Sequence, residues 1–344
     1  MSRLKVHPQR DETVEVKAEQ ESPIVEENSA GKLEQGMLAK ILLPITFSMR
    51  VFGLYFEKTD KLRMTQQYSR LYCLLILVIM WFNAIRIFTI FTRDDILQSA
   101  LEKISGVVWI VAGAIVQTAC YRASQNGRIL EELQTFNKDM NSDMAKQLRV
   151  KVISCVVIAW FYTAFAVVST AYGPFNNSQF RNLLLAPYNT MILDASPLTI
   201  NIVSSLYLVL EFYVTGTVII SLMWIYLLSA IISHKFKTCT EMMHDIVKTP
   251  ESAKNNLEMV RCRHQVLCRM VDNIDGCVCV NNATYVVSLI CEIILNLYSV
   301  IAYLDLRSRP FFLLASLLWI SSCVLGLTIV AHGGIMINQS VRVP

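Results

Sequence analysis

Six long apolar stretches limit what this sequence can fold into more than any other feature. They run over residues 69–91, 104–120, 150–172, 204–232, 276–304 and 311–337. An α-helix of about 20 mostly apolar residues spans a bilayer, and a backbone in lipid must satisfy its hydrogen bonds internally. Only 17% of the 344 residues are charged, against about 25% in a typical soluble domain. The sequence therefore predicts an all-α fold, a polytopic membrane helix bundle with six transmembrane helices.

The segments before and after these stretches complete the predicted domain organisation. Residues 1–36 are polar and rich in Glu and Lys, which predicts a disordered tail. Residues 37–56 are apolar but carry Lys40, Pro44 and Arg50, and charges near a helix centre oppose membrane insertion. We therefore expect 37–68 to be an amphipathic segment leading into the bundle, 69–337 to be the six-helix membrane domain, and 338–344 to be a short tail.

The distribution of Lys and Arg predicts the orientation of the bundle. Basic residues are dense before the first stretch, between the second and third, and between the fourth and fifth, and sparse elsewhere. Loops rich in Lys and Arg stay in the cytoplasm, so both termini and a helical extension around 231–275 are predicted to be cytoplasmic. The loop 173–203 is then outside, and its sequon predicts glycosylation at Asn176. The ten cysteines all fall in spans or on the cytoplasmic side, so no extracellular disulfide is expected.

Catalytic motifs are missing from the sequence. It holds no phosphate-binding glycine loop and no His-Glu-x-x-His, and it has only five histidines. The Cys- and His-bearing stretch 262–279 does not have the ligand spacing of zinc sites and is crowded by Arg. The modest net charge of +4 gives no sign of a nucleic-acid partner. We predict a protein that is not an enzyme, with no cofactor and no metal.

Ionisable residues inside the predicted spans point to a binding site instead. Such residues are expensive in a membrane, and they commonly face the bundle interior and mark function. Together with aromatic and polar residues at a similar depth, they predict a small-molecule pocket; the candidates are Arg86, Trp109, Tyr162, Phe165, Tyr207, Glu211, Glu292, Asn296 and Trp319. A structural salt bridge with aromatic residues at the membrane interface is the alternative interpretation.

Two other classes compete with a six-span receptor. In a seven-span G-protein-coupled receptor, residues 37–56 would form the first span, but the sequence has neither an Asp-Arg-Tyr after the relevant span nor an Asn-Pro-x-x-Tyr in the last helix. A six-span transporter or scaffold is the other alternative, although no inverted repeat is visible.

Two local motifs support the six-span receptor over these two alternatives. The stretch 42–58, "LLPITFSMRVFGLYFEK", and the stretch 126–137, "NGRILEELQTFN", together with the six-span layout, resemble the invertebrate gustatory and odorant receptor superfamily. The first stretch matches a Pro-x5-Arg-x-x-Gly-Leu pattern at Pro44, Arg50, Gly53 and Leu54. The resemblance covers residues 37–337.

This resemblance implies a multi-pass plasma-membrane chemoreceptor of the gustatory type. It implies a homo- or hetero-tetrameric, ligand-gated cation channel, with a ligand pocket in the outer half of each subunit and lipids around it. The chain after 331 and the extension around 231–275 would pack around the shared axis. The family's seventh span with its Thr-Tyr-x5-Gln-Phe signature does not follow residue 337, so we expect a truncated subunit that does not conduct alone.

Overall fold

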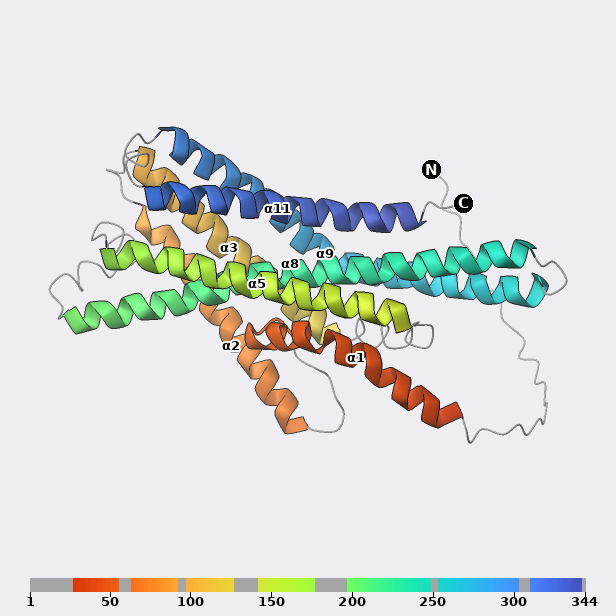
Figure 1. Cartoon of the computed structure of the whole chain (residues 1–344). Helices are drawn as coiled ribbons and strands as arrows, with labels where there is room; N and C mark the ends of the chain where they lie inside the picture. Colours follow the sequence, from red (N-terminus) through yellow and green to blue (C-terminus); the bar gives the residue numbers. More distant parts are fainter. Residues whose placement is uncertain are drawn as a thin grey trace, which may run out of the picture.

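The computed structural model describes residues 27–55, 63–91, 97–126, 142–176, 197–248, 253–302 and 310–341. Every regular element within these ranges is helical (Figure 1). In chain order the elements are α1 (Glu27–Val51), α2 (Arg63–Ile87), the 3₁₀ turn η1 (Phe88–Ile90), α3 (Leu97–Asn126), α5 (Ser142–Asn176), α8 (Pro197–Lys248), α9 (Ala253–Ala302) and α11 (Pro310–Val341).

Six helices of the described chain are long and apolar enough to cross a membrane. Their apolar parts are Gln67–Ile87, Lys103–Gln125, Ser142–Ala171, Leu198–Ile246, Val278–Ile301 and Leu313–Gln339. Each overlaps one of the six predicted stretches, so the prediction of an all-α, six-span membrane bundle is confirmed. Helix α1 carries residues 37–51 of the segment that would be the first span of a G-protein-coupled receptor, and it is not among the six.

Helix α1 buries one face, while its exposed face mixes basic residues with Leu43 and Phe47. Its buried residues repeat every three or four positions, including Leu38, Leu42, Ile45 and Met49, while Lys40 is exposed. The buried face packs against α5 and α8. The helix begins inside the predicted disordered tail 1–36, of which residues 1–26 lie outside the described residues, so the tail and the boundaries of the segment 37–68 stay predictions.

A glycine turn ends α1 in a Schellman motif. Gly53 has a positive φ of 67°, its amide donates to the carbonyl of Arg50 at 3.1 Å, and the amide of Leu54 donates to Met49 at 2.8 Å. This pair of hydrogen bonds satisfies the free carbonyls of the last turn and needs a residue that tolerates a left-handed backbone. Leu54 is buried, which accounts for the Arg50, Gly53 and Leu54 positions of the sequence motif.

Helix α8 is the centre of the bundle. The apolar span of α8 is 83% buried inside the protein, whereas that of α11 is 11% buried. At 52 residues, α8 is about 78 Å long at 1.5 Å per residue, more than twice the roughly 30 Å of a bilayer core. Part of α8 must therefore project beyond the membrane, as the sequence predicts for the region around 231–275.

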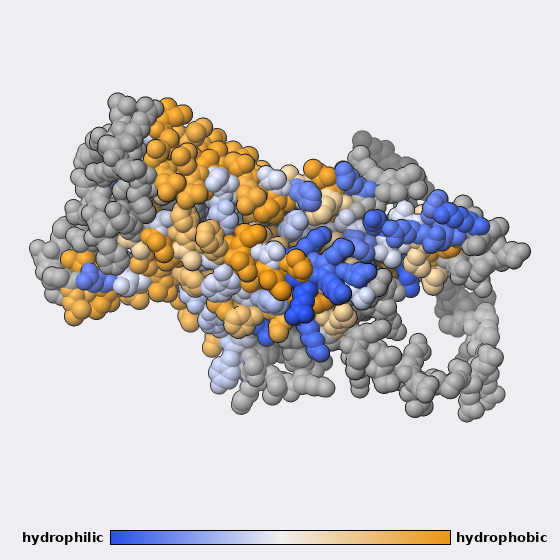
Figure 2. All heavy atoms as spheres, viewed as in Figure 1, coloured by the Kyte–Doolittle hydropathy of each residue, from blue (hydrophilic) through white to orange (hydrophobic). Residues whose placement is uncertain are grey.

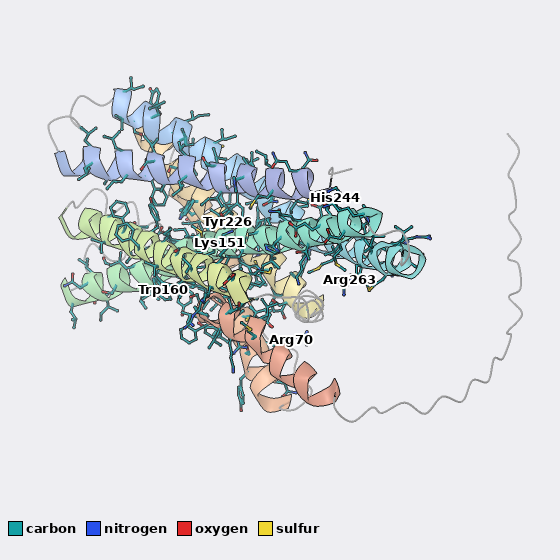
Figure 3. All side chains as sticks on the ribbon, turned by 45° about the vertical axis from the view of Figure 1, so that its right-hand side comes forward. Arg70, Lys151, Trp160, Tyr226, His244 and Arg263 are labelled. Carbon is teal, nitrogen blue, oxygen red and sulfur yellow. The ribbon has the colours of Figure 1, made fainter. Side chains whose placement is uncertain are left out.

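The projecting part of α8 is paired with the first half of α9. Figure 1 shows the two helices extending together past the rest of the bundle. The Phe236 and His264 rings lie 5.7 Å apart, and Arg263 Nη1 donates to Met242 Sδ at 3.2 Å. His244 and Arg263 lie on this pair, whereas Trp160 lies within the bundle (Figure 3). We call this pair, around residues 231–275, the projecting hairpin. The side of the membrane that it occupies stays a prediction.

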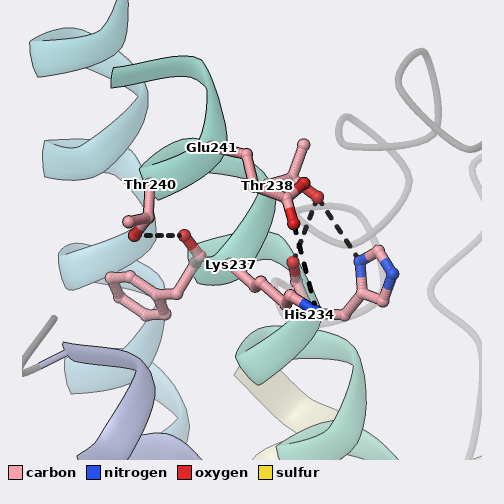
Figure 4. A network of polar contacts seen from close by, with 6 residues as sticks. His234, Lys237, Thr238, Thr240 and Glu241 are labelled. Carbon is pink, nitrogen blue, oxygen red and sulfur yellow. Dashed lines mark hydrogen bonds and ion pairs between the residues drawn. The ribbon is translucent and has the colours of Figure 1, made fainter. Parts of the chain in front are cut away.

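The surface of the projecting hairpin is polar. Lys237 and Glu241 form an exposed ion pair at 4.0 Å, and Thr238 donates to the His234 carbonyl at 3.1 Å (Figure 4). In Figure 2, hydrophilic side chains gather over this hairpin and over the first turns of α5, whereas apolar side chains cover the opposite part of α9 and α11. The polar end and the apolar end of the molecule are thus distinct, as a membrane boundary requires.

Candidate functional site

Four helices surround a cavity within the bundle. The space between its wall atoms is about 540 Å³, which includes open space at its mouth. Helices α8, α9 and α11 supply most of its wall, and α3 and α5 supply one residue each. The lining residues are Trp109, Tyr162, Val218, Ile219, Leu222, Met223, Tyr285, Leu289, Trp319, Ser322, Cys323, Leu325, Gly326 and Ile329.

Two tryptophans form an aromatic wall of the cavity. The rings of Trp109 on α3 and Trp319 on α11 lie 5.0 Å apart, edge to face at 72°. The indole of Trp109 donates to Thr215 Oγ1 of α8 at 3.2 Å. The indole of Trp319 donates to Glu292 of α9, so each indole is held by both a ring contact and a hydrogen bond, and four helices fix the orientation of this wall.

Glu292 of α9 lies beside this wall and accepts hydrogen bonds from uncharged side chains. Its Oε2 accepts from Ser105 Oγ at 2.8 Å, Asn296 Nδ2 at 3.1 Å and Trp319 Nε1 at 3.2 Å. The side chain is 1% exposed. A buried carboxylate held only by neutral groups is costly, and such groups inside a membrane commonly serve function.

Glu211 of α8 is joined to the same network. Its Oε1 accepts from Thr215 Oγ1 at 3.0 Å, and Thr215 in turn accepts from Trp109. Glu211, Thr215, Trp109, Trp319 and Glu292 therefore form one continuous chain of contacts that passes through all four helices around the cavity.

The structure divides the nine predicted ligand-binding residues into three groups. Trp109, Tyr162 and Trp319 line the cavity. Glu211, Glu292 and Asn296 belong to the polar network beside it. The remaining three, Arg86, Phe165 and Tyr207, are not among its described lining residues.

Arg86 and Tyr207 form a separate contact. The guanidinium carbon of Arg86 stands 5.9 Å from the centroid of the Tyr207 ring, and its Nε and Nη2 donate to Asn83 Oδ1 at 3.1 and 3.0 Å. Phe165 is half-buried on α5. This Arg–Tyr contact joins α2 to α8.

Sequence reasoning missed several residues of the site. Ser105 and Thr215 hold the two carboxylates, and Ser322, Cys323 and Gly326 form the α11 wall. The available signal was weak: these are small residues inside apolar spans, which mark close helix packing as readily as a cavity.

No group of three or more His, Cys, Asp or Glu side chains that could hold a metal is found among the described residues. The stretch 262–279, considered above for zinc, lies on the projecting hairpin and on α9. Its Cys268 thiol contacts His264 Nδ1 at 3.6 Å, within one helical turn.

The fold and the cavity together define a polytopic helical membrane protein with an apolar, aromatic cavity between its helices. The chain belongs to the 7tm chemosensory receptor family, whose model matches residues 42–342. This confirms the superfamily indicated by the sequence motifs, and it identifies a chemosensory receptor rather than an enzyme.

A solved structure has a similar fold. The structure of the insect olfactory receptor OR5 from Machilis hrabei matches with a TM-score of 0.59 and 15% sequence identity, over 88% of this chain and 83% of that chain. No curated protein sequence matches significantly. At this identity the structural match shows the shared fold alone, so what the cavity binds has to be argued from its own residues.

Proposed function

We propose that the protein is a subunit of a ligand-gated chemoreceptor channel that binds a small molecule in the cavity between α3, α8, α9 and α11. The observation that carries the proposal is the cavity itself, whose wall is apolar and aromatic with few polar groups. This is the composition of pockets that bind small organic molecules. Membership of the chemosensory family supports a sensory role for that ligand.

The arrangement of α8 and α9 offers a route from ligand to response. Both helices line the cavity and both continue, without a break in helical structure, into the projecting hairpin. A ligand that contacts Leu222 of α8 or Leu289 of α9 acts on two long continuous helices. A tilt of either helix moves the far end of the projecting hairpin, where the family resemblance implies contact with related subunits.

The proposal includes the surroundings of the molecule. We place the receptor in the plasma membrane as part of a homo- or hetero-tetramer of related subunits. The large apolar surfaces of α11 support this placement, since Leu314, Leu317 and Val324 are all exposed in the isolated chain. An apolar patch of this kind suits lipid or a neighbouring subunit.

Two neighbouring serines on α11 provide a matched test. Ser322 lines the cavity and is half-buried, whereas Ser321 is exposed, and each donates to a carbonyl three residues earlier, at 2.7 and 2.8 Å. Ser322→Phe fills the cavity, and Ser321→Phe adds the same bulk on the outer face. The measurement is the current evoked by a panel of tastants and odorants in cells that co-express the chain with a related subunit.

We expect Ser322→Phe to abolish responses that Ser321→Phe retains, at equal surface expression. Equal loss in both variants, or full responses in Ser322→Phe, would show that this cavity is not the ligand site.

A further inference from the structure

We propose that the cavity selects a small apolar molecule bearing a protonated amine, and that Glu292 is the group that recognises the ammonium. This inference rests on the proposed function, because it names the class of ligand for the same cavity. It is carried by the position of Glu292, by its unequal hydrogen bonding and by the aromatic groups around it.

Glu292 continues the cavity wall by one helical turn. Tyr285, Leu289, Glu292 and Asn296 follow one another at intervals of three or four residues, so they share one face of α9. The first two of these residues line the cavity. The carboxylate therefore stands at the end of the apolar wall, where the Trp319 indole, itself a lining group, donates to it.

The same end of the cavity is acidic on a second helix. Glu211, Thr215, Val218 and Leu222 share one face of α8 by the same spacing, and the last two line the cavity. Helices α8 and α9 run in opposite directions (Figure 1). Glu211 precedes the lining residues of α8 and Glu292 follows those of α9, so both acids lie beyond the same end of the apolar wall. The cavity is thus apolar, and two acids lie beyond one end of it.

The two oxygens of Glu292 are not equally satisfied. Oε2 accepts all three hydrogen bonds, from Ser105, Asn296 and Trp319. Oε1 is buried and accepts none within the described part of the chain. A buried acceptor without a donor costs free energy, and a ligand that donates to Oε1 would remove that cost.

A cation satisfies this site better than a neutral donor. The three donors on Oε2 are a hydroxyl, an amide and an indole, so none offers a counter-charge. Arg86 donates to Asn83 and stands over the Tyr207 ring. An ammonium on Oε1 would supply both a donor and a charge, and hydrogen bonds to charged groups are the stronger ones.

The aromatic wall favours the same class of ligand. The negative face of an indole ring attracts a cation, and both Trp109 and Trp319 line the cavity beside Glu292. The remaining wall, including Leu222, Leu289 and Ile329, suits the apolar body of such a molecule.

The test compares three probes that differ in one group. They are 2-phenylethylamine, which is cationic at neutral pH, 2-phenylethanol, which is neutral, and 3-phenylpropanoate, which is anionic. Binding is measured by equilibrium dialysis of the labelled probes against the purified full chain in lipid nanodiscs. We expect the amine to bind at least about tenfold more tightly than the alcohol, and the anion not to bind where the amine saturates.

The decisive variant is Glu292→Gln, which keeps the size of the side chain and removes its charge. We expect it to lose the preference for the amine and to keep the affinity for the alcohol, which also shows that the variant is folded. Glu241→Gln, on the exposed surface of the projecting hairpin, is the matched control; we expect its amine affinity to change by less than about threefold.

Equal binding of amine and alcohol to the unmodified chain would overturn the proposal, as would an amine preference that survives Glu292→Gln. The anion comparison needs no variant, and anion binding as tight as that of the amine would also overturn it. Ser322→Phe separates this failure from failure of the proposed function. If that variant blocks the alcohol while the amine shows no preference, the cavity remains the ligand site and only the ligand class is wrong.

Discussion

Gly216 is the position where a single added methyl group should disturb this bundle most. It lies within α8, between Thr215, which bonds Trp109, and Thr217, which bonds Gln117. A Cβ at residue 216 would stand 1.9 Å from Cε1 and 2.3 Å from Cζ of Phe52. The central helix therefore needs a glycine here because an aromatic ring from the end of α1 occupies the space of the side chain.

The expected cost of Gly216→Ala follows from two opposing effects. Replacing a glycine inside a helix gains about 1 kcal/mol, whereas overpacking a core costs typically about 1–3 kcal/mol and occasionally more. The Phe52 ring is fully buried, and it packs against Trp160 at 5.5 Å and Phe212 at 4.9 Å. Since the ring has no free direction in which to move, we expect the upper end of the cost and a net loss of about 2 kcal/mol.

The assay uses fluorescence-detected gel filtration to measure the fraction of protein that stays monodisperse in detergent after heating. Gly276→Ala on α9 is the control, because nothing lies within 4 Å of an added Cβ there, and we expect that variant to be at least as stable as the unmodified chain. Phe52→Leu should reduce the cost of Gly216→Ala in the double variant, with a coupling of about 1 kcal/mol or more. Equal stability of the two glycine variants would refute the placement of Phe52 against α8.

Two further predictions concern the segment after α1 and the orientation of the chain. Gln117 donates to the Gly53 carbonyl at 2.7 Å, so Gln117→Leu leaves a buried acceptor without its donor. We expect the free energy of unfolding to fall by about 1–3 kcal/mol and hydrogen exchange at Leu54 and Tyr55 to become faster. Unchanged exchange at these two residues would contradict this role of Gln117. Asn176 is the last residue of α5 and belongs to the sequon predicted to be outside. Glycosidase treatment should increase the gel mobility of the chain from eukaryotic cells but not that of Asn176→Gln. A chain that carries no glycan would count against the predicted orientation.

Local sequence patterns were enough to predict the framework. The six spans follow from hydropathy, and the end of α1 follows from the Arg50, Gly53 and Leu54 positions, because a Schellman motif involves only neighbouring residues. The length of α8 beyond the bilayer was also predictable, since its polar continuation keeps helix-forming residues such as Lys237 and Glu241.

The candidate site was predicted only in part. Charge inside apolar spans identified Glu211 and Glu292, and both lie in the polar network beside the cavity. The same reasoning grouped Arg86 with them, whereas the structure turns Arg86 to Tyr207 and Asn83. Depth along a span can be counted from sequence, but the direction in which a side chain points depends on how each helix is rotated against its neighbours.

The sequence by itself determined that this protein is a bundle of membrane-spanning helices, because the free energy of transfer into lipid is a sum over neighbouring residues. Only the tertiary structure decided that Trp109 and Trp319, more than 200 positions apart, meet at 5.0 Å and join the two acids. It also decided that Phe52 fills the space beside Gly216. Such contacts depend on the packing of whole helices against one another, which no local pattern of residues encodes.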